Sequence, residues 1–246
     1  MGSAVTDPEP PGEVPVDTAL VERLAADIAE RAVAVRARID AMATRQVRIV
    51  AVTKGHPVEV ALAARRAGFV DLGENYAQEL RAKAAVLAGL ASGGEGVGDV
   101  RWHFVGRLQA NKVRTIAGSV ALWESLDRPS VIDEVARRAP GAEAMVQVDL
   151  AGIEGRGGCP RAEAPALVER AGAAGLVVVG LMAVGPPGAP EDARPGFRWL
   201  RAEADRLGLA EVSMGMSGDL EVAVAEGATM VRVGSDLVGP RPGVRP

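Results

Sequence analysis

The chain has 246 residues, with 28 Lys and Arg against 32 Asp and Glu, so its formal net charge at pH 7 is -4. This balance gives no strong positive field for a phosphate backbone or an anionic membrane, which argues against nucleic acid and lipid as partners. One domain is expected at this length, because a single α/β barrel commonly holds about 250 residues.

The N-terminal segment carries no signal for export or membrane insertion. Residues 1–17 are rich in proline and acids, with no basic stretch and no apolar stretch, so we expect a disordered tail. No apolar run elsewhere approaches the roughly 20 residues of a membrane span. Cys159 is the one cysteine, so no intrachain disulfide can form. A cytoplasmic protein is therefore expected.

A helix is expected first, followed by alternating strands and helices. Apolar residues recur at helical spacing from Thr18 onward, and Thr18 or Asp17 can cap this helix. Eight short runs rich in β-branched residues then alternate with helical stretches, which is typical of βαβ units. The expected strands are Arg48–Thr53, Phe69–Leu72, Arg101–Val105, Val120–Ser125, Ala144–Asp149, Leu176–Met182, Glu211–Ser213 and Thr229–Val233. The expected helices between them are Val58–Ala67, Ala77–Leu90, Gln109–Ala117, Ser130–Ala139, Ala162–Ala171, Arg194–Leu207 and Asp219–Ala225.

This order predicts an α/β fold, a single (β/α)8 TIM-type barrel with an extra N-terminal helix, because eight parallel strands close a barrel. An open doubly wound sheet would give a similar alternation. Ala91–Asp99 and Gly185–Pro190 are expected loops, and no helix is expected after the last strand. The barrel domain is placed at residues 18–241, with a short tail at 242–246.

Candidate functional residues follow the first three strands, because barrel active sites lie where strands end. Lys54 would ordinarily just emerge into solvent, but burial at a barrel mouth would lower its pKa and provide a neutral amine that can condense with an aldehyde. Asn75 is either a helix cap, the locally favoured interpretation, or a ligand contact. His103 lies within a strand, where histidine is more often a satisfied wall residue than a ligand. His56, before a proline at a helix start, is interpreted as structural.

The last two strands are followed by segments suited to an anion. Phosphate sites in TIM barrels often form from the loops after strands seven and eight, where glycine lets backbone N–H groups approach. Ser213–Ser217 and Val233–Ser235 occupy these places, and the hydroxyls of Ser217 and Ser235 would add donors. Two tight turns with a helix cap at Ser217 are the competing interpretation. Arg232, inside the eighth strand, needs an acceptor, which an internal ligand would provide.

Other chemistries have little support. Two separated histidines and one cysteine give no metal-ligand spacing, and neither a Walker motif nor a serine elbow occurs. The glycine-rich stretch Gly155–Gly158 is interpreted as a mobile loop. Cys159 lacks a paired histidine and is expected to be unreactive.

Five motifs in this order resemble the pyridoxal phosphate homeostasis family, the YggS/PROSC-type proteins, over roughly Thr18–Arg241. They are AVTK (51–54), GEN (73–75), WHFVGRLQANK (102–112), SMGMS (213–217) and MVRVGS (230–235). The resemblance implies a barrel like the N-terminal one of alanine racemase, with Lys54 joined to pyridoxal 5'-phosphate (PLP) as a Schiff base. It also implies the other cofactor contacts: Ser217, Gly234 and Ser235 with the phosphate, Arg232 with the pyridine nitrogen, Asn75 near the ring, and Met216 and His103 in the same set.

The resemblance implies a PLP carrier in intracellular cofactor homeostasis, with PLP-dependent apo-enzymes as partners and a monomeric state. A cation beside the pyridine nitrogen makes the ring a poor electron sink, so strong catalysis is not expected. An amino acid racemase of the alanine racemase type is the alternative, although Tyr76 is the only tyrosine. A phosphosugar barrel is a third possibility. The sequence departs from the family where His56 replaces a second lysine, where Gly155–Gly158 replaces a lysine-containing loop, and where Ser235 replaces threonine.

Overall fold

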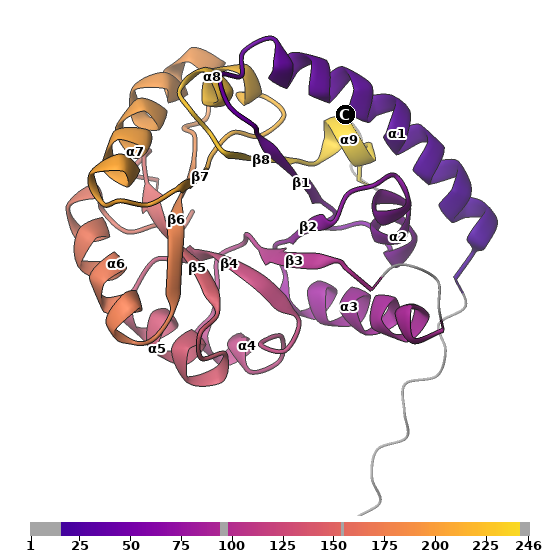
Figure 1. Cartoon of the computed structure of the whole chain (residues 1–246), viewed down its shortest axis with the longest axis horizontal. Coiled ribbons are helices and arrows are strands. Elements are labelled where there is room, and N and C mark those ends of the chain that lie inside the picture. Colours follow the sequence, from indigo (N-terminus) through magenta and orange to yellow (C-terminus); the bar gives the residue numbers. More distant parts are fainter. Residues whose placement is uncertain (1–15, 94–97, 154, 242–246) are drawn as a thin grey trace, which may run out of the picture.

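The structure is a computed structural model that describes residues 16–93, 98–153 and 155–241. Eight parallel strands close into a barrel in chain order, with the first strand paired to the last (Figure 1). The strands are β1 (Arg48–Val52), β2 (Asp71–Glu74), β3 (Arg101–Phe104), β4 (Val120–Leu126), β5 (Glu143–Asp149), β6 (Val177–Val184), β7 (Glu211–Ser213) and β8 (Met230–Val233). This closed order excludes an open doubly wound sheet and confirms the predicted (β/α)8 barrel.

The helices surround the barrel (Figure 1). They are α1 (Thr18–Asp40), α2 (Val58–Arg66), α3 (Ala77–Ser92), α4 (Ala110–Val113), α5 (Pro129–Arg138), α6 (Ala164–Ala173), α7 (Arg194–Arg206), α8 (Leu220–Ala225) and α9 (Ser235–Val238), with 3-10 turns η1 (Arg161–Glu163) and η2 (Pro190–Ala193). No helix of the described residues is long and apolar enough to cross a membrane.

The extra helix α1 packs on the outside of the barrel, where it contacts α2, α8 and α9. Asp17 is its cap, since the Asp17 Oδ1 atom accepts a hydrogen bond from the N–H of Leu20 at 2.9 Å. One face, which includes Val21, Ile28 and Val35, is buried. The apolar spacing seen in the sequence therefore places α1 beside the last helix of the chain.

Most predicted element boundaries lie within two residues of the observed ones, and three differences affect the description of the barrel. β2 begins two residues later than expected, because the N–H of Phe69 still bonds to the carbonyl of Ala64 at the end of α2. α4 is only one turn long, and the Thr115 hydroxyl bonds to the carbonyl of Lys112 just after it. The expectation of no helix after the last strand is wrong, since β8 leads directly into the short helix α9.

The barrel interior is partly apolar and partly charged. A small apolar cluster fills part of it: Val50, Leu122, Met145, Met182 and Met230. His103, Glu124 and Arg232 are buried there as well, whereas Glu74 is buried on the outer face of the sheet, toward Lys83 of α3. Charged side chains in a barrel interior require partners, and these partners shape the site described below. Residues 1–15, 94–97 and 242–246, which hold most of the predicted tails and part of one predicted loop, lie outside the described residues.

Candidate functional site

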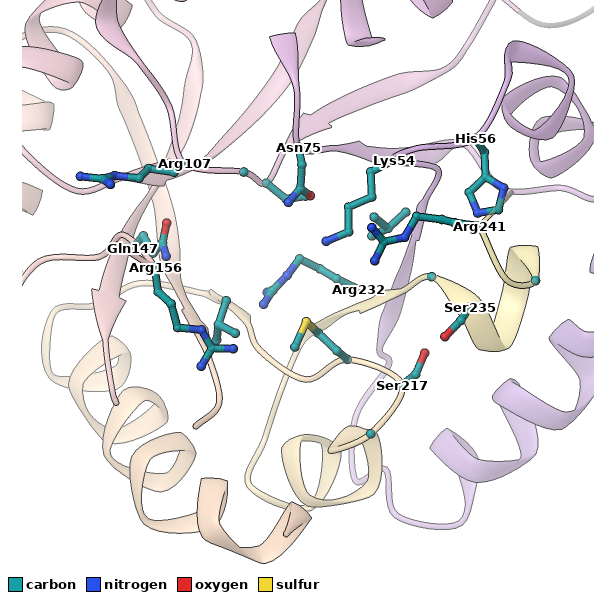
Figure 2. Close-up of a pocket in the computed structure, with 18 residues that line it drawn as sticks. Lys54, His56, Asn75, Arg107, Gln147, Arg156, Ser217, Arg232, Ser235 and Arg241 are labelled. Atoms are coloured by element: carbon teal, nitrogen blue, oxygen red, sulfur yellow. The ribbon is translucent and has the colours of Figure 1, made fainter. Parts of the chain in front are cut away.

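A cavity of about 420 Å³ opens where the strands end (Figure 2). Its lining comes from residues near the ends of β1, β5, β6 and β8 and from the segments that follow β1, β2, β3, β5, β7 and β8. The lining residues are Val52, Lys54, His56, Asn75, Val105, Gly106, Arg107, Gln147, Arg156, Val184, Met216, Ser217, Gly218, Arg232, Gly234, Ser235, Gly239 and Arg241. The size falls within the range of small-molecule sites.

Seven of the eight predicted site residues lie in this lining: Lys54, Asn75, Met216, Ser217, Arg232, Gly234 and Ser235. His103 does not. It is fully buried in the barrel wall, with Nδ1 2.6 Å from Glu124 Oε1 and Nε2 3.0 Å from Asp71 Oδ1. Both ring nitrogens are therefore occupied by protein, as the wall-residue interpretation of a strand histidine expected, and the structure corrects its assignment as a cofactor contact.

The amine of Lys54 points into the middle of the cavity, beside Arg232 (Figure 2). Burial lowers the pKa of Lys54, and the positive charges of Arg241 and Arg232 lower it further. Among the described residues, Lys54 forms no hydrogen bond or ion pair. At a given pH, a larger fraction of this amine is therefore in the neutral, nucleophilic form than for a solvent-exposed lysine.

A buried ion cluster fixes the backbone on both sides of Lys54. The amine of Lys83, on α3, bonds to the carbonyl oxygen of Thr53 at 2.7 Å and to Glu74 Oε1 at 2.5 Å. On the other side, Glu79 Oε2 accepts the N–H of Gly55 at 2.7 Å and lies 3.5 Å from the same amine. Lys54 therefore leaves β1 from a backbone held by Lys83 and its two carboxylates.

The opposite end of the cavity carries hydroxyl donors from two loops. Ser217 follows β7 and Ser235 follows β8, and their hydroxyls point toward the same space in Figure 2. Gly215, which precedes the first loop, has a φ of +91°, and an added Cβ would lie 2.4 Å from the Cβ of Ala223. Only glycine fits there, so the path of the first loop depends on it.

Arg38 at the end of α1 joins these two loops. Its guanidinium donates to the carbonyl of Ser217 at 3.0 Å, to Glu221 Oε1 at 2.6 Å and to Asp236 Oδ2 at 2.7 Å. Glu221 lies on α8 and Asp236 on α9, so one side chain links α1 to both segments that carry the serine hydroxyls. The extra N-terminal helix thus has a direct structural connection to the site.

We expect Arg38→Met to weaken anion binding at the serine loops by about fivefold, because several partly exposed charge pairs are lost while the methionine keeps the apolar packing of the side chain. Equilibrium titration with PLP, followed by absorbance, measures this. Arg23→Met, an exposed change on the same helix, is the matched control and should bind as the wild type does. Equal dissociation constants for the two variants would contradict the role given to Arg38.

The guanidinium of Arg232 finds protein acceptors inside the barrel. Nη1 donates to the Ser213 hydroxyl at 2.7 Å and Nη2 to the carbonyl of Ala183 at 2.8 Å. Arg232 thus has the acceptors that the sequence predicted it to need, and the protein itself provides two of them. Two of its five N–H groups are bonded in this way, and the guanidinium still lines the cavity.

Two helix caps that the sequence left open as alternatives are not the caps in the structure. The residue that caps α3 is Tyr76, not Asn75, and Asn75 lines the cavity. The cap of α8 is Asp219, which frees Ser217 for the cavity. His56, interpreted as structural, also lines it.

Besides His56, four polar side chains of the lining were not singled out as site residues from the sequence: Arg107, Gln147, Arg156 and Arg241. The three arginines, with Lys54 and Arg232, give the cavity five basic side chains, and no carboxylate lines it among the described residues. This imbalance favours an anionic ligand.

Cys159 lies elsewhere, and burial raises the pKa of its thiol to about 12, so it stays protonated. The described residues contain no group of three His, Cys, Asp or Glu side chains placed to hold a metal ion.

Known proteins resemble the chain over most of its length. Residues 28–242 match the family profile of the alanine racemase N-terminal domain. The pyridoxal phosphate homeostasis protein of Aquifex aeolicus is 38% identical over 207 residues, which cover 79% of this chain and 87% of that protein. The protein of the same name from Deinococcus radiodurans is 40% identical over 196 residues, covering 78% and 88%. The chain belongs to the pyridoxal phosphate homeostasis family.

Solved structures agree with this membership. PipY of Synechococcus elongatus PCC7942, solved with PLP bound, has a TM-score of 0.75 and 32% identity, and the match covers 86% of this chain and all of that one. Alanine racemase of Clostridium difficile 630 has a TM-score of 0.62 at 14% identity, and the match covers 57% of its chain. That second likeness shows a shared barrel fold, whereas the first lies within the family.

Proposed function

We propose that this protein binds PLP as a Schiff base on Lys54 and takes part in intracellular PLP homeostasis, without strong catalytic activity of its own. The observation that carries the proposal is an unpaired amine of lowered pKa inside a cavity with five basic side chains and no lining carboxylate among the described residues. PLP fits this donor set, because it combines an aldehyde with a phosphate.

Each part of the cavity has a role in this proposal. Lys54 supplies the amine, and Ser217, Gly234 and Ser235 supply donors for the phosphate. Arg232 faces the pyridine nitrogen and disfavours its protonation. Asn75 and Met216 line the space for the ring. When bound, PLP supplies the electrophilic carbonyl carbon, and the protein's own groups bind and orient it.

The proposal is tested by the absorption spectrum of the protein with PLP before and after borohydride, followed by peptide mapping. Lys54, Lys83 and Lys112 are the only lysines of the chain, so mapping has few alternatives. We expect a visible band that borohydride removes and a modified peptide that contains Lys54. A protein that gains no such band, or a label confined to another lysine, would overturn the proposal.

Formation of the adduct should depend on pH in a way that the pKa of Lys54 dictates. Only the neutral amine attacks the carbonyl, and burial lowers the pKa of Lys54 below its usual value of 10.5. The rate should therefore rise with pH and reach half its maximum below the pH at which a free lysine side chain does. Stopped-flow absorbance with N-acetyl-lysine amide as the reference measures this, and equal midpoints would contradict the lowered pKa.

The racemase alternative makes a different prediction. A racemase removes the α-proton of the amino acid, which requires a second acid–base group near the ring. Tyr76, the only tyrosine, is 53% exposed and does not line the cavity. We therefore expect that L- or D-alanine exchanges its α-proton with deuterium oxide far more slowly with this protein than with a dedicated racemase. Exchange at a comparable rate would replace the carrier proposal.

The same proposal places the carrier in the cytoplasm, as a monomer with one barrel domain at residues 18–241 that passes PLP to apo-enzymes. The location is supported by the single cysteine, which suits a reducing compartment. Sedimentation equilibrium of the PLP-loaded protein tests the monomer. Reactivation of a PLP-dependent apo-enzyme, compared with free PLP at the same concentration, tests delivery.

A further inference from the structure

A continuous chain of polar side chains crosses the barrel interior and ends at Arg232. Asp71 at the start of β2 contacts His103 on β3, with Oδ1 3.0 Å from Nε2. The other ring nitrogen, Nδ1, lies 2.6 Å from Glu124 Oε1 on β4. The hydroxyl of Ser213 on β7 donates a hydrogen bond to Glu124 Oε2 at 2.6 Å. The same hydroxyl accepts a hydrogen bond from Arg232 Nη1 at 2.7 Å. Four contacts thus join five strands through the middle of the barrel.

The direction of each hydrogen bond can be assigned from donor and acceptor chemistry. Arg232 can only donate, so Ser213 accepts from it and gives its own hydrogen to Glu124. Burial acts to raise the pKa of Glu124, but contacts with His103 and Arg232 lower it overall, so Glu124 is ionised and accepts at both oxygens. His103 must then donate from Nδ1.

The contact with Asp71, at the other end of this row of polar side chains, bears on the protonation of His103. Nε2 faces Asp71, whose pKa is lowered by its contacts with His103 and Arg101 despite burial, so this carboxylate also accepts. Each ring nitrogen of His103 thus faces a carboxylate oxygen, which is the arrangement in which an imidazolium donates from both nitrogens. Burial opposes this charge, but the hydrogen bonds to Asp71 and Glu124 raise the pKa of His103 overall. The charges then alternate along the row: Asp71 is negative, His103 positive and Glu124 negative. Arg232, on the other side of the neutral Ser213, is positive.

The charge of Arg232 needs this arrangement. The residue is only 4% exposed, and a buried guanidinium without a counter-charge is strongly destabilising. Glu124, with Oε2 at 4.0 Å from Nη1, is the carboxylate in ion-pair range of it, and Asp219 adds a weaker favourable charge. Ser213 and the carbonyl of Ala183 hold two of its N–H groups, which limits the directions in which the others can point.

We propose that Glu124 is a positioning residue: its carboxylate, held by His103 and Ser213, compensates the charge of Arg232 and fixes the guanidinium toward the pyridine ring. The inference deepens the proposed function and rests on it, since Arg232 faces a ring only when PLP occupies the cavity. His103 then acts on the site indirectly, through Glu124, although it does not line the cavity.

Ser213→Ala and Glu124→Gln test the role, with Ser125→Ala as the matched control. Ser125 is a buried strand serine whose hydroxyl has no partner in the structure, so its removal breaks no hydrogen bond. Loss of one hydrogen bond to a charged group is expected to raise the dissociation constant of PLP about tenfold in Ser213→Ala and to displace the absorption maximum of the bound cofactor. The control should keep the wild-type values.

A second measurement uses the wild-type protein without cofactor. Nitrogen-15 NMR at pH 7 should show His103 with both ring nitrogens protonated, and Glu124→Gln should return it to a neutral ring. The chain has two histidines, so His56→Gln assigns the signals. A wild-type His103 without a proton on Nδ1 would mean that Glu124 carries the proton of their 2.6 Å contact and is neutral, which would overturn the inference. This result does not depend on whether Glu124→Gln folds.

The outcomes separate this inference from the proposed function. A wild type that binds no PLP overturns the proposed function and the role of Glu124 toward that cofactor together. A wild type that binds PLP on Lys54, combined with Ser213→Ala and Ser125→Ala proteins of equal affinity and spectrum, overturns only the positioning role.

Discussion

Lys54→Ala is expected to abolish the borohydride-reducible PLP adduct, because Lys54 carries the one amine that lines the cavity among the described residues. Lys83 is 4% exposed and its amine is bonded to Thr53 and Glu74, so it is not available to an aldehyde. Lys112 lies outside the cavity lining. The measurement is the visible spectrum and the mass of the reduced protein. PLP should still bind weakly through its phosphate, and a stoichiometric covalent adduct should be lost.

Lys112→Ala is the matched control, since it removes one of the three lysines and leaves the cavity unchanged. It should keep the band and gain the full mass of one reduced cofactor. An adduct that survives Lys54→Ala at full yield would show that another amine carries the cofactor, and the assignment of the whole cavity would then be wrong. A small residual yield spread over several peptides is the ordinary background of PLP with surface amines.

The barrel could be predicted because its signals are local. Each strand is an apolar run beside an amphipathic stretch, and eight such units close a sheet. The errors fall where tertiary contacts override local preference. β2 includes Gly73 and Glu74, two residue types that do not favour a buried strand. Glu74 is accommodated there because its carboxylate bonds to the Lys83 amine and the Thr53 hydroxyl. A partner distant in sequence cannot be seen from the run itself.

The site could be predicted only in part for the same reason. Lys54 and Arg232 belong to strands or their ends, where barrel topology gives them a place. Arg107, Arg156 and Arg241 lie in exposed loop segments, where a charged side chain is ordinarily solvated. Only closure of the barrel brings these three loops around one cavity.

One missed signal was present in the sequence. Lys83 lies three residues after Leu80 and four before Leu87, both of which are buried on the same face of α3. A lysine in phase with buried leucines is itself expected to be buried, and a buried lysine needs an anionic partner. The position of Glu124 between Trp123 and Ser125 in an apolar strand is a similar signal.

Lys83→Met should lower the free energy of unfolding by about 3–5 kcal/mol, because it removes the cation from a buried ion cluster and leaves the carboxylates behind. Methionine nearly conserves the length and apolar surface of the lysine stem, so the loss reports the charge. The side chain of Glu74 is fully buried, and its Oε2 atom has no partner even in the wild type. Chemical denaturation measures the effect, with Lys112→Met as the control.

The pH dependence identifies the cause of that loss. Burial already raises the pKa of Glu74, and the lysine opposes this rise. Without the lysine, the folded state binds a proton on Glu74 more tightly than the unfolded state does, so stability must increase as the pH falls from 7 toward 5. Adding Glu74→Gln to Lys83→Met should remove this slope and restore part of the stability, because the neutral amide needs no cation. If the double variant were as unstable as Lys83→Met at every pH, the loss would arise from packing and from the freed carbonyl of Thr53, and the backbone of Lys54 would not depend on the charge of the cluster.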